Sequence, residues 1–383
     1  MAKLVLTAEN FAFGPIGKLL DIADLLKDQG HELVFVGFGT ALQLAESFPF
    51  TEIYKIDTDN PASKDALEKV ITQADILISS MDLPSVIIAK CLGKPVVWVD
   101  CLFWFWESIP EPLFDIDLYV RERSLKDSVN ESKYGPKIKN LFSVGPIVPK
   151  IKHAERKSQA LISFGGGEAS YWYKAGIDSN YPFVMTDILL KDVDWSQFER
   201  TIVTTSKCIL RELFKRFPLT PFEFSTCGSH DGFIKELSES EVLLITPGLV
   251  TSQSAFESGT PTIFLPPSNN SQYLQLDEFR ELGLARASVH LSDFLPKLDL
   301  RGKPPRETSK QVLRQLSELE QSAEIQTGMG SRIDELVKNR RKWSLASINN
   351  CRNFIDSLGG NGAQAVTDKI TQLLVTNGFH YYE

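Results

Sequence analysis

The sequence is poor in cysteine, and its cysteines lie far apart. Five cysteines are spread over 383 residues, and none forms a Cys-x-x-Cys pair. An odd number at such wide spacing is not the pattern of a disulfide framework. We therefore expect each cysteine to pack as a small apolar side chain, in a reducing, cytoplasmic compartment.

Long apolar segments are also missing. No run of 18 apolar residues occurs, so the sequence predicts no helix that spans a membrane. The first seven residues contain one lysine and no small-residue cleavage site. They are typical of a strand rather than of a signal peptide.

Positive charge is in deficit. Lysine and arginine number 41 against 49 acidic residues, which gives a net charge of −8. Binding to a nucleic-acid backbone needs an excess of basic residues, so we expect no nucleic-acid partner. The histidines are scattered, and their spacing matches no metal site. We therefore expect neither a metal nor a cofactor, although backbone amides can still bind a local anion.

What the chain does contain is a regular alternation of strands and helices. Residues 4–7 form an apolar run, 18–29 have apolar residues at helical spacing, and 31–37 are again apolar. Gly30 stands where a helix-ending glycine is expected. The same alternation continues to about residue 120. It predicts an α/β fold with a parallel, doubly wound sheet.

The alternation is interrupted once and then resumes. Residues 142–149 contain Gly145, Pro146 and Pro149, and a charged stretch follows up to residue 158. This composition favours an interdomain linker. The predicted organisation is an N-terminal Rossmann-like domain over 1–150, a C-terminal Rossmann-like domain over 151–350, and C-terminal helices over 351–383 that return to the N-terminal domain.

The charged region 310–337 is expected to be helical. Its composition favours a solvated helix, and pairing with a second copy of the chain is the alternative. Nothing else in the sequence bears on the oligomeric state.

A first glycine-rich motif follows the predicted strand at 159–163. It reads Ile162-Ser-Phe-Gly-Gly-Gly-Glu168. Three glycines after a strand let the backbone approach a ligand, and their amides can surround an anion. A tight strand-to-helix turn would use the same residues. The motif is not Gly-x-Gly-x-x-Gly, which weakens a nicotinamide interpretation.

A second motif begins at the end of an apolar strand, with Thr246-Pro247-Gly248, and hydroxyl residues then open a helix. The N-terminus of a helix at the carboxyl edge of a parallel sheet is an expected anion site. The next strand ends in the polar loop 266–272. Two polar loops at neighbouring strand ends predict one wall of a ligand site.

The region from His230 to Gln275 resembles the donor-binding region of GT-B glycosyltransferases. The likeness is to the N-acetylglucosaminyltransferases that act on lipid I and to the glucosyl- and glucuronosyltransferases. It implies two Rossmann-like domains that face each other across a cleft. It also implies that the Phe233-Ile234 pair, placed before a helix, contacts the nucleobase through its backbone. The donor-binding residues expected on these grounds are Ser163, Gly165, Gly166, Gly167, Phe233, Ile234, Thr246, Gly248, Val250, Thr251, Ser252, Asn270 and Gln272.

The sequence departs from that family at three positions. The ribose-binding Glu of the family falls on Ser254, with Glu257 three residues later. The Asp that holds the sugar hydroxyls falls on Ser271. The His-Gly pair of the phosphate loop is Pro247-Gly248. These differences leave the nucleobase and the sugar open.

The acceptor is expected to bind the N-terminal half. The family places a catalytic base, commonly His, after the first strand, and the loop 9–17 contains no histidine. Glu9 is the nearest replacement by chemistry, because a carboxylate can take the proton of the attacking group. A solvated loop residue is the alternative for Glu9. Asp100, which ends the strand 96–99, is a second candidate base, and Asp82 is a weaker one.

The expected acceptor-binding residues are Asn10, Phe11, Gly14, Trp104 and Trp106. The cluster 103–106 is entirely aromatic and could stack on a planar acceptor, or it could form a hydrophobic lid. Together with Thr7-Ala8-Glu9 and Gly17-Lys18, it gives a weaker likeness to cytosylglucuronate synthases.

The resemblance thus implies a glycosyltransferase. It would move a sugar from a nucleotide-diphosphate sugar, UDP-linked by likeness, to a small acceptor, without metal and with inversion. A sugar-nucleotide hydrolase or 2-epimerase of the same fold is one alternative. A non-catalytic nucleotide-sugar-binding protein is another.

Overall fold

The computed structural model describes residues 1–124, 127–149, 151, 154–167, 180–376 and 378. The chain divides into two compact units. The first comprises Met1–Lys150 and Ile355–Glu383, and the second comprises Ile151–Phe354. Each unit contains its own hydrophobic core, and the units are described separately. No helix within the described ranges is both long and apolar enough to cross a membrane.

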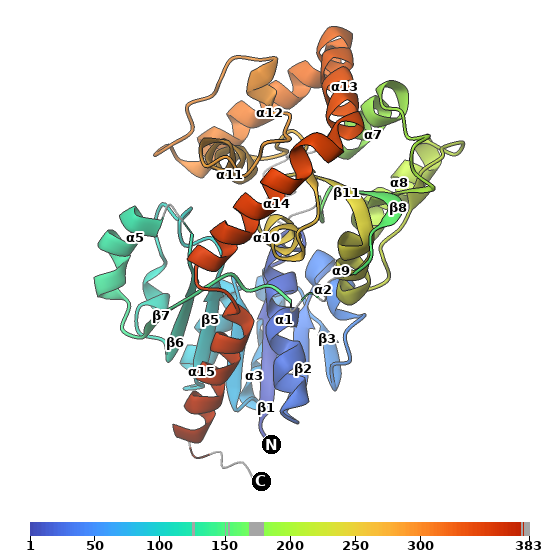
Figure 1. Cartoon of the computed structure of the whole chain (residues 1–383). Coiled ribbons are helices and arrows are strands. Elements are labelled where there is room, and N and C mark those ends of the chain that lie inside the picture. The colour runs from blue at the N-terminus through green and yellow to red at the C-terminus, as the bar shows by residue number, and fades with distance from the viewer. Residues whose placement is uncertain (125–126, 150, 152–153, 168–179, 377, 379–383) are drawn as a thin grey trace. The chain divides into compact units, whose positions relative to one another are not determined.

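The first unit is built on a seven-stranded sheet in the order β3-β2-β1-β4-β5-β6-β7 (Figure 1), and every pairing is parallel. The strand order reverses between β1 and β4, as in a doubly wound sheet. The strands are β1 (Lys3–Ala8), β2 (Glu32–Gly37), β3 (Glu52–Lys55), β4 (Ile76–Ser80), β5 (Val96–Asp100), β6 (Leu118–Glu122) and β7 (Leu141–Val144).

Helices cover this sheet, and the last helix of the chain packs against the first. In Figure 1, α1 and α15 lie side by side. Leu19 and Ile22 of α1 share one apolar core with Val366 and Ile370 of α15. The helices of the unit are α1 (Gly14–Asp28), α2 (Gly39–Ala45), α3 (Lys64–Thr72), α4 (Leu83–Cys91), α5 (Asp127–Tyr134) and α15 (Gly362–Thr376), with one-turn 3-10 helices at η1 (Pro61–Ser63), η2 (Glu111–Leu113) and η3 (Gly135–Lys137).

The beginning of the expected linker is instead a strand. Residues 142–144 belong to β7, which pairs with β6 at the edge of the first sheet. Val144 is buried in the core, and Phe142 packs against it. Pairing with β6 and burial of apolar side chains therefore make these residues a strand, although a glycine and two prolines follow directly.

Two glycines bring the chain before and after the second unit into contact. The amide of Gly362 donates to the carbonyl of Pro146 at 3.0 Å. A Cβ added to Gly362 would lie 2.2 Å from the carbonyl oxygen of Gly145. Backbone packs directly on backbone here, and no side chain fits between the two segments.

The second unit has a five-stranded parallel sheet in the order β10-β9-β8-β11-β12. A short bridge from Phe264 to Ser288 extends it beyond β12. Both sheets are thus parallel and doubly wound in character, as the sequence predicts. The strands are β8 (Lys157–Ser163), β9 (Arg200–Thr204), β10 (Glu223–Phe224), β11 (Ser240–Ile245) and β12 (Thr262–Phe264).

The helices of the second unit include one that the sequence reasoning missed. They are α7 (Tyr181–Asp192), α8 (Lys207–Arg216), α9 (His230–Glu239), α10 (Leu249–Ser258), α11 (Asn270–Glu281), α12 (Pro305–Gln321), α13 (Ala323–Lys338) and α14 (Arg340–Ser357), with η4 (Leu291–Asp293). Over residues 340–350 of α14 no element was expected, and its last residues, 351–357, fall within the C-terminal helices expected over 351–383. Its polar and basic sequence gives little apolar periodicity, and its last residues pass into the first unit.

The charged region 310–337 is not one solvated helix. It forms most of α12 and α13, which are separated at Ser322, whose hydroxyl caps α13 by accepting a bond from Ile325 N. Val312 on α12 and Ile333 on α13 are fully buried in the core of the unit. The charged residues occupy the other faces of two amphipathic helices.

Candidate functional site

Acidic side chains gather at the carboxyl edge of the first sheet. Glu9 follows β1, Asp82 follows β4, and Asp100 ends β5. The backbone continues the β1–β4 ladder here, because Glu9 N donates to Ser80 O at 2.9 Å. The structure therefore brings together the three carboxyl groups that the sequence nominated.

Glu9 is the most perturbed of these acids. Burial raises its pKa, and the negative charges of Asp82, Asp59 and Asp100 raise it further, to about 8. Glu9 stays half-buried, so its carboxyl group is desolvated without being sealed in the core. A carboxyl group with such a pKa can both accept and release a proton near neutral pH.

Asp59 is a contributor that the sequence reasoning overlooked. It lies in the loop after β3, at the same sheet edge as Glu9. Its position in a loop, four residues beyond the end of β3, was the available signal.

Asp100 is engaged on both carboxylate oxygens. Oδ2 accepts bonds from the Tyr119 hydroxyl at 2.5 Å and from Trp106 Nε1 at 2.8 Å, and Oδ1 accepts from the amide of Leu102 at 2.8 Å. Asp100 is fully buried. Its geometry is that of an anchor for the aromatic loop, and this favours Glu9 over Asp100 as a base.

Asp82 is likewise held by its neighbours. It is buried, and the Ser85 hydroxyl donates to its Oδ2 at 2.5 Å. Burial raises its pKa, while the hydrogen bond from Ser85 acts in the opposite direction. Asp82 therefore acts on Glu9 through charge.

The aromatic loop 103–106 is fixed from two sides. Trp106 is bonded to Asp100, and the Asn130 side-chain amide donates to the carbonyls of Phe103 and Trp106 at 2.6 and 2.9 Å. Phe103 is buried, whereas Trp104 stays half-buried with its Nε1 lacking a hydrogen-bond partner. That N–H is itself inaccessible to solvent, so only the half-buried ring of Trp104 can border a ligand.

The other predicted acceptor residues differ in their surroundings. Asn10 Oδ1 accepts bonds from the amide and the hydroxyl of Thr40, both at 2.9 Å, so Asn10 holds the start of α2. Phe11 is half-buried beside Glu9, and Gly14 is the first residue of α1. Ala12 between them has a φ of 47°, a strained value for a residue with a Cβ.

A buried ion pair supports this edge from below. Lys18 Nζ lies 3.0 Å from Glu122 Oε2, both side chains are almost inaccessible to solvent, and Nζ also donates to the carbonyl of Ile147 at 2.5 Å. The pair links α1, β6 and the chain after β7. Sequence reasoning gave Lys18 no role, because its partner lies 104 residues away.

In the second unit, loops after β8 and β11 meet at the carboxyl edge. The amide of Thr246 donates to Ser163 O at 3.2 Å, and Gly165 N donates to Ser163 Oγ at 3.3 Å. Gly165 and Gly167 have φ values of 65° and 62°, which glycine adopts readily. Gly166 lies between them, and Glu168 lies outside the described residues.

The N-terminus of α10 follows directly. Gly248 is its N-cap residue, and no side chain of the described residues makes a capping bond there. The amides of Leu249, Val250 and Thr251 belong to the first turn, where a helix has no internal acceptor for them. Ser252 N already bonds to Gly248 O, and the Ser252 hydroxyl does the same at 2.7 Å. Three amides are thus available to an anion.

The polar loop after β12 reaches the same place. Gln272 Nε2 lies 4.0 Å from the position that a Cβ would occupy at Gly248, and its Oε1 accepts two bonds from Ser268 at 2.9 Å. Asn270 has a different environment. Its Nδ2 donates to Thr308 Oγ1 at 2.9 Å and ties α11 to α12.

The Phe233-Ile234 pair lies inside a helix and not before one. Both residues belong to α9, whose N-cap Ser229 accepts a bond from Gly232 N. Phe233 N already donates to Ser229 O at 2.9 Å. The boundary was misplaced because Ser229 caps the helix earlier than the apolar pattern begins.

The family's ribose and sugar positions are also altered in space. Ser254 is buried within α10 and its hydroxyl has no hydrogen-bond partner in the part of the chain that the structure describes, whereas Glu257 is exposed. The Ser271 hydroxyl donates to Asn269 Oδ1 at 2.8 Å. Among the described residues, no group of three or more His, Cys, Asp or Glu is arranged to hold a metal ion.

No family model matches the chain, and no curated protein matches its sequence. Solved structures do match. The spinosyn rhamnosyltransferase SpnG, complexed with spinosyn aglycone, is 15% identical, with 97% of this chain and 100% of that chain covered at a TM-score of 0.53. The spinosyn forosaminyltransferase SpnP is 14% identical, with 98% and 99% covered at a TM-score of 0.50. These likenesses show that the chain has the GT-B fold.

Proposed function

We propose that this protein is a glycosyltransferase that moves a sugar from a nucleotide-diphosphate sugar to the hydroxyl group of a small, planar acceptor. The first unit supplies the base, and the second supplies the anion site. The GT-B fold supports the proposal, and the residues at the carboxyl edges of the two sheets supply the chemistry.

Glu9 carries the proposal. Its ionised carboxylate takes the proton of the acceptor hydroxyl, and the oxygen then forms a bond to the anomeric carbon of the sugar. The bond from that carbon to the diphosphate breaks, and the electron pair leaves with the nucleotide. A base of pKa about 8 is matched to an alcohol that becomes acidic only in the transition state.

The departing diphosphate is stabilised by the first turn of α10. The amides of residues 249–251 and the helix dipole both favour negative charge. Loop 163–167 adds the amides of a glycine-rich turn. Because the protein itself supplies this positive potential, we expect no metal requirement, and the direct displacement inverts the anomeric centre.

A thermal-shift panel with UDP, TDP, GDP and CDP, with and without Mg²⁺ and EDTA, tests the donor site. A ligand at about 100 times its dissociation constant stabilises the folded state by roughly 2.7 kcal/mol. One diphosphate, UDP by resemblance, is expected to raise the midpoint equally in EDTA. If no diphosphate shifts it, the chain is not a nucleotide-sugar enzyme.

A substitution at the first position of α10 separates the amide from its side chain. Leu249→Pro removes one N–H, and the helix tolerates proline there because Gly248 already has the extended φ and ψ that precede proline. Leu249→Ala removes the side chain and keeps the N–H. Loss of one charge-assisted hydrogen bond of about 1.5 kcal/mol should weaken diphosphate binding roughly tenfold, and only in the proline variant. Equal affinities in the two variants would place the diphosphate elsewhere.

Transfer activity tests the base. Glu9→Gln keeps the shape of the side chain and removes the base, so we expect kcat to fall by about 10²- to 10⁴-fold. Glu111→Gln, an exposed glutamate on η2 of the same unit, is the matched control and should retain full activity. Retained activity in Glu9→Gln would exclude Glu9 as the base while leaving the donor site intact.

A further inference from the structure

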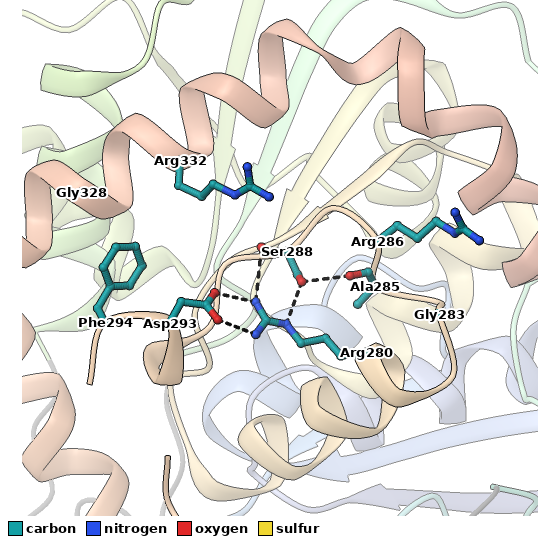
Figure 2. A pocket seen from close by; sticks show the side chains of 9 residues that line it. All are labelled: Arg280, Gly283, Ala285, Arg286, Ser288, Asp293, Phe294, Gly328 and Arg332. Carbon is teal, nitrogen blue, oxygen red and sulfur yellow. Dashed lines mark hydrogen bonds and ion pairs between the residues drawn. The ribbon is translucent and has the colours of Figure 1, made fainter. Parts of the chain in front are cut away.

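The second unit contains a pocket away from the donor loops. Its volume is about 540 Å³, which is within the usual range for small-molecule sites. Figure 2 shows the guanidinium groups of Arg280, Arg286 and Arg332 around it, with Asp293 and Phe294 on one side. Arg280 lies in the last turn of α11, whereas the donor loop lies at the first turn of that helix, about 15 Å away along its axis.

The charge of the lining is positive in an acidic protein. Three arginines face one aspartate in the pocket, which leaves an excess of two positive charges, whereas the whole chain carries −8. Arg286 is exposed, and it takes part in none of the ion pairs found among the described residues. Arg332 pairs with Glu335 one turn along α13, on the surface. Such an exposed pair holds its arginine weakly, so both guanidinium groups can turn to a ligand.

Arg280 is fixed in place. Its two terminal nitrogens each donate to one oxygen of Asp293 at 2.7 Å, and its Nε donates to Ser288 Oγ at 2.9 Å. This bidentate pairing neutralises its charge and sets the plane of the guanidinium. Arg280 therefore forms a rigid floor of the pocket, between the exposed guanidinium groups of Arg286 and Arg332.

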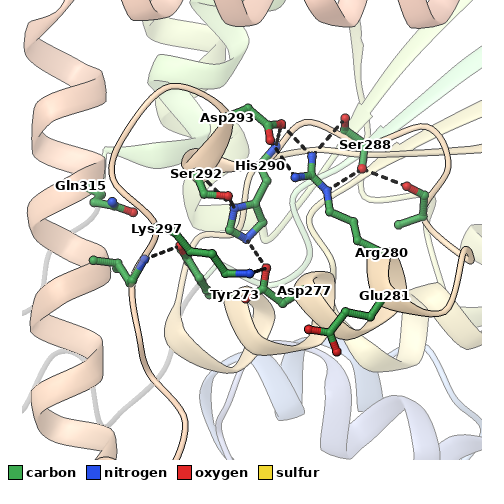
Figure 3. A network of polar contacts seen from close by, with 12 residues as sticks. Tyr273, Asp277, Arg280, Glu281, Ser288, His290, Ser292, Asp293, Lys297 and Gln315 are labelled. Carbon is green, nitrogen blue, oxygen red and sulfur yellow. Dashed lines mark hydrogen bonds and ion pairs between the residues drawn. The ribbon is translucent and has the colours of Figure 1, made fainter.

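A network behind the pocket holds that floor. Asp293 Oδ2 also accepts the amide of His290 at 2.8 Å, and Ser292 N donates to His290 Nδ1 at 3.0 Å (Figure 3). Burial lowers the pKa of His290 to about 4, helped by the charge of Arg280, so the ring is neutral at pH 7. The ring packs edge-on against Tyr273 of α11, with centroids 4.2 Å apart.

An aromatic wall completes the pocket. Phe294 lines it, and the backbone of α13 approaches the ring so closely that a Cβ at Gly328 would lie 3.1 Å from Phe294 Cε1. The ring is therefore held at one edge while the rest borders the pocket. Planar groups pack well against such a ring.

We propose that this pocket binds a small phosphate monoester that bears a planar group. The phosphate carries about −1.5 to −2 at pH 7, which matches the excess of two positive charges, and planar guanidinium groups suit phosphate geometry. The planar group lies against Phe294. The site is separate from the proposed donor site and does not depend on it.

Isothermal titration calorimetry with phenyl phosphate tests the proposal on the full chain, with inorganic phosphate and benzoate as comparison ligands. Phenyl phosphate is expected to bind at least tenfold more tightly than either, because only it has both the double charge and the ring. Its affinity should fall between 50 and 300 mM NaCl because salt screens the arginines. No binding of phenyl phosphate, or equal binding of benzoate, would overturn the proposal.

Variants locate the binding. The double substitution Arg286→Gln and Arg332→Gln removes the two exposed guanidinium charges and should weaken the binding of phenyl phosphate at least tenfold. Arg314→Gln, on the exposed face of α12 outside the pocket, is the matched control and should change affinity less than twofold. Leu249→Pro should leave phenyl phosphate binding unchanged. Binding that survives the double substitution, or that falls in Leu249→Pro, would show that the ligand occupies another site.

Discussion

Ionisation of Glu9 should destabilise the folded protein as the pH rises. Its pKa is about 8 in the folded state against an ordinary value of 4.5. The folded state therefore keeps a proton that the unfolded chain loses between pH 4.5 and 8, and stability falls with pH through that window. Above pH 8 the full difference between the two pKa values corresponds to roughly 5 kcal/mol, at 1.36 kcal/mol per pKa unit.

The measurable effect is smaller than that ceiling. Glu9 is half-buried, and water screens part of its interaction with the neighbouring acids, so about 2 kcal/mol is the expected size. Glu9→Gln removes the charge and keeps the shape. We expect its thermal midpoint to exceed that of the natural protein by about 4–8 °C at pH 8 and by about 1 °C at pH 5.

The assay is a set of thermal unfolding curves from pH 5 to 8.5 for the natural protein, Glu9→Gln and Glu111→Gln. The Glu111→Gln midpoints should follow the natural protein at every pH. Parallel pH profiles for Glu9→Gln and the natural protein would refute the reasoning, since the carboxyl group would then ionise alike in the folded and unfolded chain.

Three other predictions address the reaction and the packing. If Glu9 is the base, kcat/KM rises with pH, reaches half its maximum near pH 8 and levels off above about pH 9. A flat profile over pH 6–9 would contradict it. Lys18→Met should lower the free energy of unfolding by about 3–5 kcal/mol, because it leaves Glu122 buried and unpaired. Adding Glu122→Leu should restore most of the lost stability. If urea unfolding shows no such recovery, the two residues do not act as a pair. Gly362→Ala should lower the free energy of unfolding by more than about 3 kcal/mol, because the new Cβ meets backbone atoms. Gly135→Ala is the control and should be nearly neutral, because its Cβ meets only side chains at 3.8 Å or more. Similar thermal midpoints for the two variants would refute the backbone contact.

Sequence reasoning was strongest where local patterns decide structure. Apolar runs of five or six residues between amphipathic helices indicated two parallel sheets, because strands buried on both faces need continuous apolar sequence. Polar and glycine-rich residues after those runs indicated ligand loops, because the carboxyl ends of parallel strands share one edge. Asp100, Gly165 and Gly248 were nominated on that basis, whereas Glu9 was nominated because the resembled family places its base after the first strand.

Sequence reasoning failed where long-range contacts outweigh composition. The strand β7 reads as the start of a linker, and α14 gives little apolar periodicity. The charged stretch 310–337 hides two apolar faces that only the core of the second unit reveals. Asn270 has the character of a ligand-binding amide, yet its bond to Thr308 on α12 gives it a structural task.

The sequence by itself determined the fold class, the order of the elements and the two sheet edges at which function is expected, because hydrophobic periodicity and turn residues act over a few positions. The tertiary structure alone decided the state of each charge. The pKa of Glu9 depends on Asp59, Asp82 and Asp100, which lie 50 to 91 residues away, and Arg332 joins Arg280 and Arg286 at the pocket from α13, 46 residues beyond Arg286. Electrostatic energy depends on distance and burial, and neither can be read from position in the chain.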